Sequence, residues 1–327
     1  MGVDKMIALI RLPEATTGMV EVNRMAIQAF RFDKVIDASR LTHSIISLIK
    51  FRLKRGRSNV YMVSPVRVLG YLWVVIIQLT VQPELLILHC HNRSFRLTRS
   101  LSILLSSFSR VRFIYLSETL AQNHPVDKFE YRIVPNFSKF DSKTIQKNED
   151  CPLKFGYVGN LISEKGYCKI FELSKEFSHI SFSVVGKFPS IDEKERFYSD
   201  PENLEKIKRI NWNDNGLYGD KLRYHYATLD VLIFPTEYSH EAFPLVIIEA
   251  LSQGCYILTT SIGGIPDIVT EEWIGKCISP DQLIEEIALL QLGDYLSFEN
   301  RLKRSKHAKK LYSIDSFKRR FNESLRP

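Results

Sequence analysis

Short apolar runs alternate with longer amphipathic segments along the whole chain. The runs are rich in β-branched and aromatic residues, which predicts strands, and the segments between them have the period of helices. Alternation of this kind is typical of βα units that build a parallel sheet. In the first half the expected strands are residues 7–12, 34–37, 60–64, 85–91, 112–117 and 132–135, and the expected helices lie near residues 19–30, 42–54, 70–81 and 96–107.

The pattern lapses into polar residues at 136–152 and then restarts, which indicates an interdomain linker. The second set of expected strands is residues 154–158, 181–185, 209–212, 231–234, 255–259 and 276–278. We therefore predict an α/β protein with two doubly wound, Rossmann-like domains facing each other across a cleft. They cover residues 1–148 and 149–313, and a helix at 314–327 is expected to pack back on the first domain.

Composition narrows the class of protein. The 327 residues are 45% hydrophobic and 25% charged, which is typical of a globular chain of about two domains. The first residues do not resemble a secretion signal, and the apolar stretch 70–81 is shorter than the roughly 20 residues that a bilayer requires, so it is read as a buried helix. Five scattered cysteines favour reduced thiols in the cytosol.

A formal charge of +8 favours anionic partners without choosing among them. Much of the excess lies in residues 50–57 and 301–320. Each cluster is interpreted as a solvated helix face in preference to a dedicated docking surface. No nucleic-acid recognition motif accompanies these runs, so nucleic acid is not an expected partner.

The most informative segment is residues 234–254, where an expected strand leads into a polar loop and then a helix near Pro244. Proline suits a first helical turn, and the free amides at residues 244–247 would bind phosphate. Glu249 lies about one turn into this helix, on an apolar face. Such a carboxylate either pairs with a nearby cation or accepts hydrogen bonds from sugar hydroxyls.

Two further glycine-containing turns follow expected strands. Residues 155–166 place Asn160 and Lys165 after a glycine turn, and Lys165 is a candidate charge for a diphosphate. Residues 261–267 carry paired glycines at the end of another strand. Either one is, on its own, equally explained as a tight βα turn. Gly186, after the strand at 181–185, is a further candidate in the donor site.

In the first domain, the loop that ends at Gly18 would bring backbone amides to the cleft. Strand alternation puts His89 and His91 on one face and Cys90 on the other. Two histidines can also bind a metal, but no Cys, Asp or Glu lies nearby in the sequence to complete a zinc site.

Taken together, these residues resemble the GT-B glycosyltransferases of family four, which share a Glu-x7-Glu signature. Here that signature is Glu241 to Glu249. Further elements recur in family order over nearly the whole chain: Thr17-Gly18-Met19, His91, Leu116-Ser-Glu118, Val134-Pro-Asn136, Gly159 with Lys165-Gly166, and Gly263-Gly264-Ile-Pro. The second half carries the more specific matches.

The resemblance implies a retaining reaction on a nucleotide diphosphate sugar, without a metal ion or other cofactor. Lys165 and the amides around Ala242, Phe243, Pro244 and Leu245 would hold the diphosphate. Glu249 would bind the ribose and Glu241 the transferred sugar. His91 and the Gly18 loop would border the sugar and the acceptor.

Two residues depart from the family pattern: Asn160 replaces a common arginine, and Thr17 replaces the first glycine of a Gly-Gly loop. No two aspartates stand two residues apart, so the metal-binding Asp-x-Asp of the other large glycosyltransferase fold is missing from the sequence.

A nucleotide-dependent epimerase or oxidoreductase is the first alternative, but it would need a Gly-x-Gly-x-x-Gly turn, which the sequence does not contain. A nonenzymatic basic binding protein is the second alternative.

We expect the chain to act in the cytoplasm on a glycan or lipid-linked acceptor of surface polysaccharide synthesis, with peripheral contact to the anionic inner face of the plasma membrane.

Overall fold

The computed structural model describes residues 6–10, 18–38, 41–55, 59–63, 67–91, 97–126, 128–141 and 152–326. The chain forms two compact units, Met1–Asn136 with Ile314–Pro327, and Phe137–Ser313. The boundary between the units lies after Asn136, and residues 137–141 pack within the second unit. The amide of Ser138 donates to the carbonyl of Tyr312 at 2.8 Å, and the side-chain amide of Gln253 donates to the carbonyl of Asp141 at 2.9 Å.

The first unit is built on a six-stranded parallel sheet of order β2-β1-β3-β4-β5-β6. Strands β1, β4 and β5 are buried along their whole length, as expected for a parallel sheet covered on both faces. The strands are β1 Met6–Ile10, β2 Lys34–Asp37, β3 Asn59–Val63, β4 Leu86–Cys90, β5 Val111–Tyr115 and β6 Glu130–Ile133. The helices are α1 Gly18–Ala29, α2 Leu41–Arg55, α3 Arg67–Thr80, α4 Arg99–Leu105, α5 Glu118–Asn123 and α13 Ile314–Leu325.

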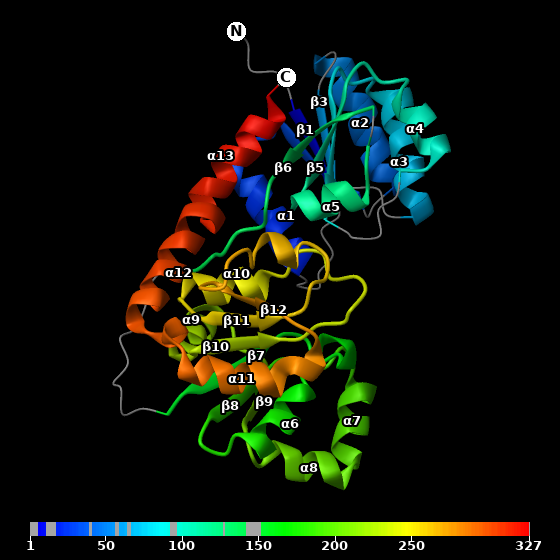
Figure 1. Cartoon of the computed structure of the whole chain (residues 1–327). Helices are drawn as coiled ribbons and strands as arrows, with labels where there is room; N and C mark the ends of the chain where they lie inside the picture. Colours follow the sequence, from blue (N-terminus) through cyan, green and yellow to red (C-terminus); the bar gives the residue numbers. More distant parts are fainter. Residues whose placement is uncertain are drawn as a thin grey trace. The chain divides into compact units, whose positions relative to one another are not determined.

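Two groups of helices cover this sheet. Helices α2, α3 and α4 lie side by side on one face, and α1 and α13 pack together on the other (Figure 1). Phe321 of α13 packs its ring against those of Tyr61 and His89, with ring centroids 5.3 and 6.2 Å apart. Arg112 of β5 donates to the carbonyl of Ser324 at 2.6 Å. The terminal helix is therefore part of the core of the first unit.

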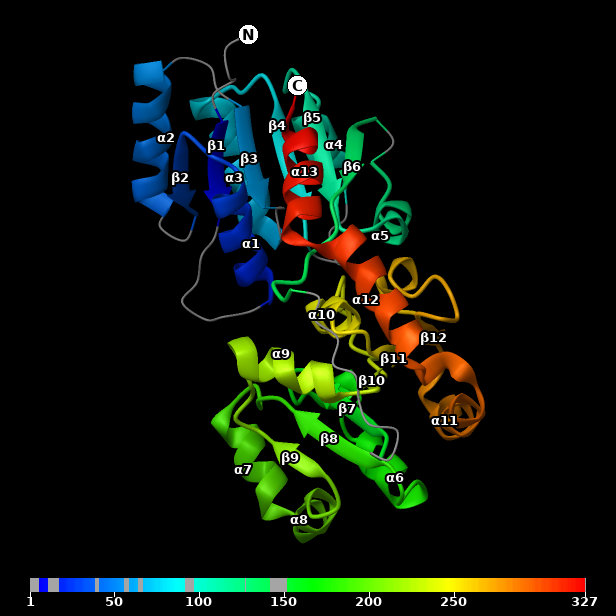
Figure 2. The ribbon, with the colours of Figure 1, turned by 90° about the vertical axis from the view of Figure 1, so that its left-hand side faces the viewer.

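The second unit also has a six-stranded parallel sheet, of order β12-β11-β10-β7-β8-β9. The strands are β7 Lys154–Val158, β8 Ser181–Val185, β9 Asn211–Asn213, β10 Val231–Phe234, β11 Tyr256–Thr259 and β12 Gly275–Cys277. The helices are α6 Lys169–Glu176, α7 Ile191–Ser199, α8 Pro201–Ile207, α9 Gly219–Thr228, α10 Leu245–Ser252, α11 Leu283–Leu292 and α12 Phe298–Tyr312, with short 3-10 turns at Ser163–Lys165, Ile265–Asp267, Pro280–Gln282 and Asp294–Leu296 (Figure 2).

Every strand expected from the sequence is present, within two residues at each end. The prediction of an α/β fold with two doubly wound domains is therefore confirmed.

The basic cluster at 301–320 was predicted to be a solvated helix face. This prediction holds only in part, because two of its arginines are buried. Arg301 donates to the carbonyl of Leu229 at 2.7 Å, and Arg304 donates to the carbonyl of Gly254 at 2.8 Å. Such bonds satisfy a buried guanidinium that would otherwise be costly. Both side chains fix α12 to the second sheet. In the part of the chain that the structure describes, no helix is both long and apolar enough to cross a membrane.

Candidate active site

The second sheet has a topological switch point between its neighbouring strands β7 and β10. From β7 the chain continues outward to β8 and β9, and from β10 it continues in the opposite direction to β11 and β12. Open parallel sheets bind their ligands beside such a point, at the carboxyl ends of the strands. The segments that leave β7 and β10 carry Lys165 and Glu241, respectively.

Lys165 and Glu241 form an ion pair at this edge of the sheet. The Nζ of Lys165 lies 2.8 Å from Oε2 of Glu241, and both side chains are largely buried. The same ammonium lies 5.2 Å from the centre of the Tyr238 ring and 5.8 Å from that of Phe234, within reach of a cation–π attraction. The structure thus brings together two residues that the sequence assigned to one site.

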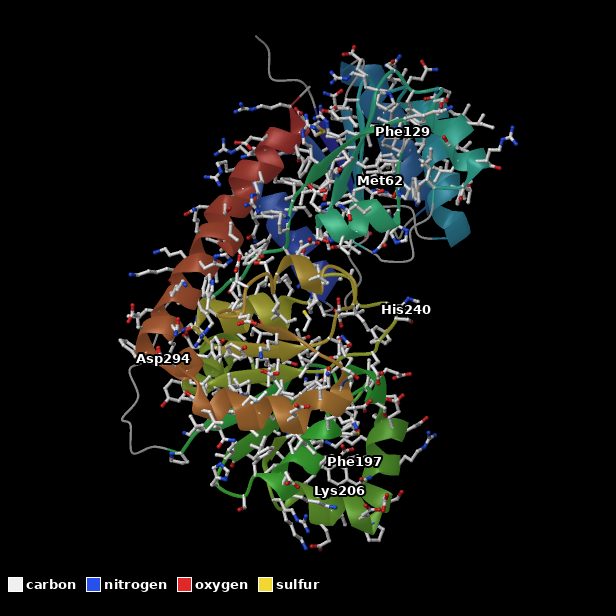
Figure 3. The ribbon with its side chains drawn as sticks, viewed as in Figure 1. Met62, Phe129, Phe197, Lys206, His240 and Asp294 are labelled. Carbon is white, nitrogen blue, oxygen red and sulfur yellow. The ribbon has the colours of Figure 1, made fainter. Side chains whose placement is uncertain are left out.

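The two loops that carry this pair are fastened to each other. The amide of Glu237 donates to the carbonyl of Glu164 at 2.6 Å. Gly166 has a φ of +83°, and a Cβ there would lie 2.6 Å from the carbonyl oxygen of Pro235. Only glycine suits both the left-handed backbone and this close approach. Figure 3 shows His240 at the outer end of the loop that carries Glu241.

Helix α10 begins at Leu245, one residue later than expected. Pro244 is the N-cap residue, with an extended backbone and no capping side chain. Proline has no amide hydrogen, so the amides free to bind an anion start at Leu245 and not at residue 244. Among the described residues, the amides of Leu245 and Val246 have no hydrogen-bond acceptor. This helix start is therefore open to a phosphate oxygen.

Glu249 is buried in the second turn of α10, with 7% of its surface exposed. The hydroxyl of Tyr226, from α9, donates to Oε2 of Glu249 at 3.2 Å. Burial first, and then the neighbouring carboxylate, raises the pKa of Tyr226 well above its ordinary value, so the hydroxyl stays protonated and acts as a donor. Tyr226 was not predicted as a site residue, because nothing in the sequence shows that α9 lies beside α10.

The residues between Glu241 and α10 contribute to the candidate site through their backbone more than through their side chains. Ala242, Phe243 and Pro244 are buried, and the ring of Phe243 packs against that of Tyr312 with centroids 6.1 Å apart. The amide of Gly264 donates to the carbonyl of Ala242 at 2.6 Å. The paired-glycine turn therefore supports the loop of Glu241.

Asn160 and Gly186 lie at the ends of β7 and β8. Asn160 is exposed, and its carbonyl accepts a hydrogen bond from the Tyr157 hydroxyl at 2.7 Å. Gly186 packs directly against the turn at Gly159, where a Cβ would lie 2.1 Å from a carbonyl oxygen. Gly186 thus allows the ends of β7 and β8 to approach each other closely. A larger residue would not fit at this position.

A cavity of about 620 Å³ opens after β9, at the same edge of the sheet. Its rim is fixed by Asp214, which pairs with Lys194 at 2.8 Å and accepts a bond from Tyr198 at 3.0 Å. This cavity was not predicted from the sequence, where its signal is the Asn-Asp-Asn-Gly turn that follows an expected strand. The lining residues are Trp212, Asn213, Asp214, Asn215, Gly216, Leu217, Tyr218 and Lys221.

In the first unit, His89 and His91 project from the same side of β4, as strand alternation predicted, with ring centroids 3.9 Å apart. The Tyr61 hydroxyl is hydrogen bonded to Nδ1 of His89 at 2.7 Å. Burial lowers the pKa of His91 to about 4, and burial together with the charge of His91 lowers that of His89 well below its ordinary value. Both rings are therefore neutral near pH 7.

Neither Nε2 of His89 nor Nε2 of His91 has a hydrogen-bond partner within the described part of the chain. Gly18 is the first residue of α1, and the loop before it, which includes Thr17, lies outside the described residues. No group of three or more His, Cys, Asp or Glu among the described residues is arranged to hold a metal ion.

Two curated relatives resemble parts of the chain. The sulfoquinovosyl transferase of Arabidopsis thaliana is 43% identical over 60 residues, which are 18% of this chain and 11% of the relative. The lipopolysaccharide 1,2-N-acetylglucosaminetransferase of Salmonella typhimurium is 25% identical over 185 residues, which are 52% of this chain and 47% of the relative. The chain thus aligns with less than half the length of either relative.

Among solved structures, Anabaena Alr3699/HepE in complex with UDP superposes with a TM-score of 0.76 at 12% identity, over 98% of this chain and 99% of that one. This likeness shows the fold, which is the GT-B fold of glycosyltransferases.

The family model described as glycosyl transferases group 1 matches residues 138–311. This range is almost the whole second unit and includes both members of the Lys165–Glu241 pair, the start of α10 and Glu249. The chain therefore belongs to the glycosyl transferases group 1 family.

Proposed function

We propose that the chain is a retaining glycosyltransferase of family four that uses a nucleotide diphosphate sugar and requires no metal ion. The observation that carries this proposal is the Lys165–Glu241 pair, held at the switch point of the second sheet. A carboxylate suited to sugar hydroxyls and a cation suited to phosphate stand side by side there.

Different groups around this pair bind the different parts of the donor. Lys165 and the amides of Leu245 and Val246 hold the diphosphate, Glu241 binds the transferred sugar, and Glu249 binds the ribose. The cavity after β9 takes the base. By the family resemblance, His91 and the backbone at Gly18 border the sugar and the acceptor.

The chemistry follows from where charge develops. When the bond between the sugar and the diphosphate breaks, negative charge grows on the departing phosphate. An ammonium with three donors can keep Glu241 and still reach a phosphate oxygen, and the open helix start adds a partial positive charge. Fixed groups of this kind are the largest source of rate enhancement in many enzymes. Lys165 and the helix start supply the positive charge that a metal ion supplies in metal-dependent enzymes.

Retention of the anomeric configuration follows if the acceptor attacks from the face that the phosphate leaves. The leaving phosphate oxygen then takes the proton from the acceptor hydroxyl, and no side chain has to act as a nucleophile. This part of the proposal rests on the family resemblance.

The acceptor is proposed to be a glycan or a lipid-linked glycan of surface polysaccharide synthesis, such as capsule, O-antigen or lipopolysaccharide. Two observations support it. One relative is named as a lipopolysaccharide glycosyltransferase, and the net charge of +8 favours an anionic surface, here the inner face of the plasma membrane.

The test is a binding and hydrolysis screen of UDP-, GDP-, ADP- and TDP-sugars in the presence of EDTA. Wild type is compared with Glu249→Ala and with Glu285→Ala, a matched control at an exposed glutamate of α11. We expect one donor to bind and to be slowly hydrolysed, Glu249→Ala to lose this, and Glu285→Ala to keep it. The anomer released, followed by NMR, reports retention or inversion.

Three outcomes would contradict the proposal. Binding of no nucleotide sugar would overturn the transferase assignment. Dependence on a divalent ion would overturn the metal-free mechanism alone. Release of the opposite anomer would overturn retention and leave the donor site intact.

A further inference from the structure

The outer surface of α2 is more apolar than a solvated helix requires. Ile46, Ile49 and Leu53 recur at helical spacing on its exposed side, and Leu53 is 80% exposed. The opposite side of the helix is buried against the sheet through Leu48 and Phe51. Helix α2 is therefore apolar on both sides.

Helix α3 repeats this arrangement, contrary to the prediction of a buried helix at 70–81. Leu72, Val75 and Leu79 are exposed, and Leu79 is 74% exposed, while Trp73 and Ile77 are buried. In α4, Ile103 is also exposed. Single exposed apolar residues are common, but repeated ones at helical spacing on adjacent helices mark an interaction site.

These side chains belong to neighbouring helices. Helix α3 packs between α2 and α4, and both views of the ribbon place the three together on one face of the sheet (Figures 1 and 2). The hydroxyl of Tyr71 is hydrogen bonded to that of Thr98 at 2.7 Å, and the amide of Gln78 donates to the carbonyl of Ser107 at 3.2 Å. We call the outer surface of α2, α3 and α4 the helical face.

The three helices that form the helical face carry charge of one sign in their sequences. The helices contain no Asp or Glu, although these make up 37 of the 327 residues of the chain. They contain six basic residues: Lys50, Arg52, Lys54, Arg55, Arg67 and Arg99. Apolar residues interspersed with basic ones are characteristic of helices that lie in the interface of an anionic bilayer.

We propose that the helical face docks on an anionic lipid bilayer. The exposed Ile and Leu side chains enter the boundary between headgroups and acyl chains, and Lys50 and Arg99, both exposed, contact the lipid phosphates. The proposal deepens the proposed function and rests on it for its purpose, which is to bring the enzyme to a lipid-linked acceptor. A second copy of the chain fits poorly, because a two-fold contact would bring the exposed Lys50 and Arg99 of one copy close to the same positive charges of the other.

The experiment is flotation of the full chain with vesicles of phosphatidylcholine, alone or with about 30 mol% phosphatidylglycerol, at about 0.1 M salt. We expect binding only to the anionic vesicles. Leu53→Ser, Leu79→Ser and Ile103→Ser together should weaken it at least tenfold. The matched control carries Ile191→Ser, Leu289→Ser and Leu292→Ser, three exposed apolar residues of the second unit, and should bind like wild type.

A second pair of variants tests the charges. Lys50→Gln, Arg52→Gln and Arg99→Gln together should lower binding by about fivefold per charge, on the order of 100-fold in all. The control Lys306→Gln, Lys309→Gln and Lys310→Gln removes three exposed charges of α12 and should have a much smaller effect.

Donor hydrolysis is measured on all variants and should equal that of wild type. The hydrolysis measurement separates the docking proposal from the proposed function. Vesicle binding can fail while hydrolysis persists, and hydrolysis can fail while vesicle binding persists. Absence of binding to anionic vesicles would overturn the docking proposal, and so would an unchanged apolar triple variant. A change from dimer to monomer in that variant, seen by analytical ultracentrifugation, would assign the helical face to self-association instead.

Discussion

The hydroxyl of Tyr226 donates a hydrogen bond to Oε2 of the buried Glu249 at 3.2 Å. This bond fixes the carboxylate that we assign to the ribose of the donor. Removing the hydroxyl by Tyr226→Phe should cost about 0.5 to 1.5 kcal/mol of binding, which is a loss of roughly 2- to 10-fold in donor affinity. Titration calorimetry with the donor identified in the screen measures it.

Tyr256→Phe is the matched control for that substitution. The hydroxyl of Tyr256 is also buried in the second unit, but it has no hydrogen-bond partner among the described residues. Its removal should leave donor affinity unchanged. Equal losses in the two variants would mean that the bond to Glu249 has no part in binding.

Lys165→Met should lower kcat by about 100- to 1,000-fold, because it removes a charge aimed at the leaving phosphate. It also leaves the largely buried Glu241 without its cation, so thermal unfolding is measured alongside the rate. The control is Lys169→Met, which breaks the more exposed pair between Lys169 and Glu172. Its rate should stay close to that of wild type. A Lys165→Met enzyme with normal kcat would contradict the assignment to the diphosphate.

Asn160→Arg should tighten donor binding. Asn160 is exposed at the end of β7, and its backbone carbonyl accepts hydrogen bonds from the Tyr157 hydroxyl and the Ile162 amide. An arginine there adds a cation next to the loop that holds Lys165. We expect affinity for the nucleoside diphosphate to rise about threefold or more, with a steeper dependence on salt. Unchanged affinity at low salt would show that this position does not face the phosphates.

The stability of the first unit should fall in mild acid because of His89 and His91. Both have pKa values below the roughly 6.5 of an unfolded chain, and that of His91 is about 4. Below about pH 6.5 the unfolded chain binds protons that the native state does not. The contribution of the two histidines to the free energy of unfolding is therefore at its full value above about pH 6.5. It decreases as the pH falls toward 4, by up to about 1.4 kcal/mol per pH unit for each proton.

Thermal unfolding between about pH 7.5 and pH 5 tests this expectation. His91→Asn should reduce the slope, because one of the two depressed groups is gone. His43→Asn changes an exposed histidine of α2 and should leave the slope as in wild type. A steeper slope in His91→Asn would mean that protonation of His91 does not destabilise the folded protein.

The sequence predicted the elements well because parallel strands buried on both faces leave continuous apolar runs. The strands β7, β8 and β10 begin and end at the expected residues. The loops after β7 and β10 were assigned to one site through the family resemblance, and the structure places Nζ of Lys165 2.8 Å from Oε2 of Glu241.

Other features depend on which helices become neighbours, and a local pattern does not contain that information. Tyr226 meets Glu249 only because α9 packs beside α10. Arg301 and Arg304 looked like a solvated charge cluster, yet they are buried because their guanidinium groups find backbone carbonyls. The same holds for the helical face, since the apolar period of α3 does not reveal which side of the helix the sheet covers.

The path of the chain through the first unit has a consequence for biosynthesis. The second unit is one continuous segment, whereas the first is completed by α13, whose Phe321 covers Tyr61 and His89. During translation the second unit can fold as soon as it leaves the ribosome. Tyr61 and His89 stay uncovered until α13 has been made, so a ribosome that stalls earlier releases a folded second unit together with an incomplete first unit.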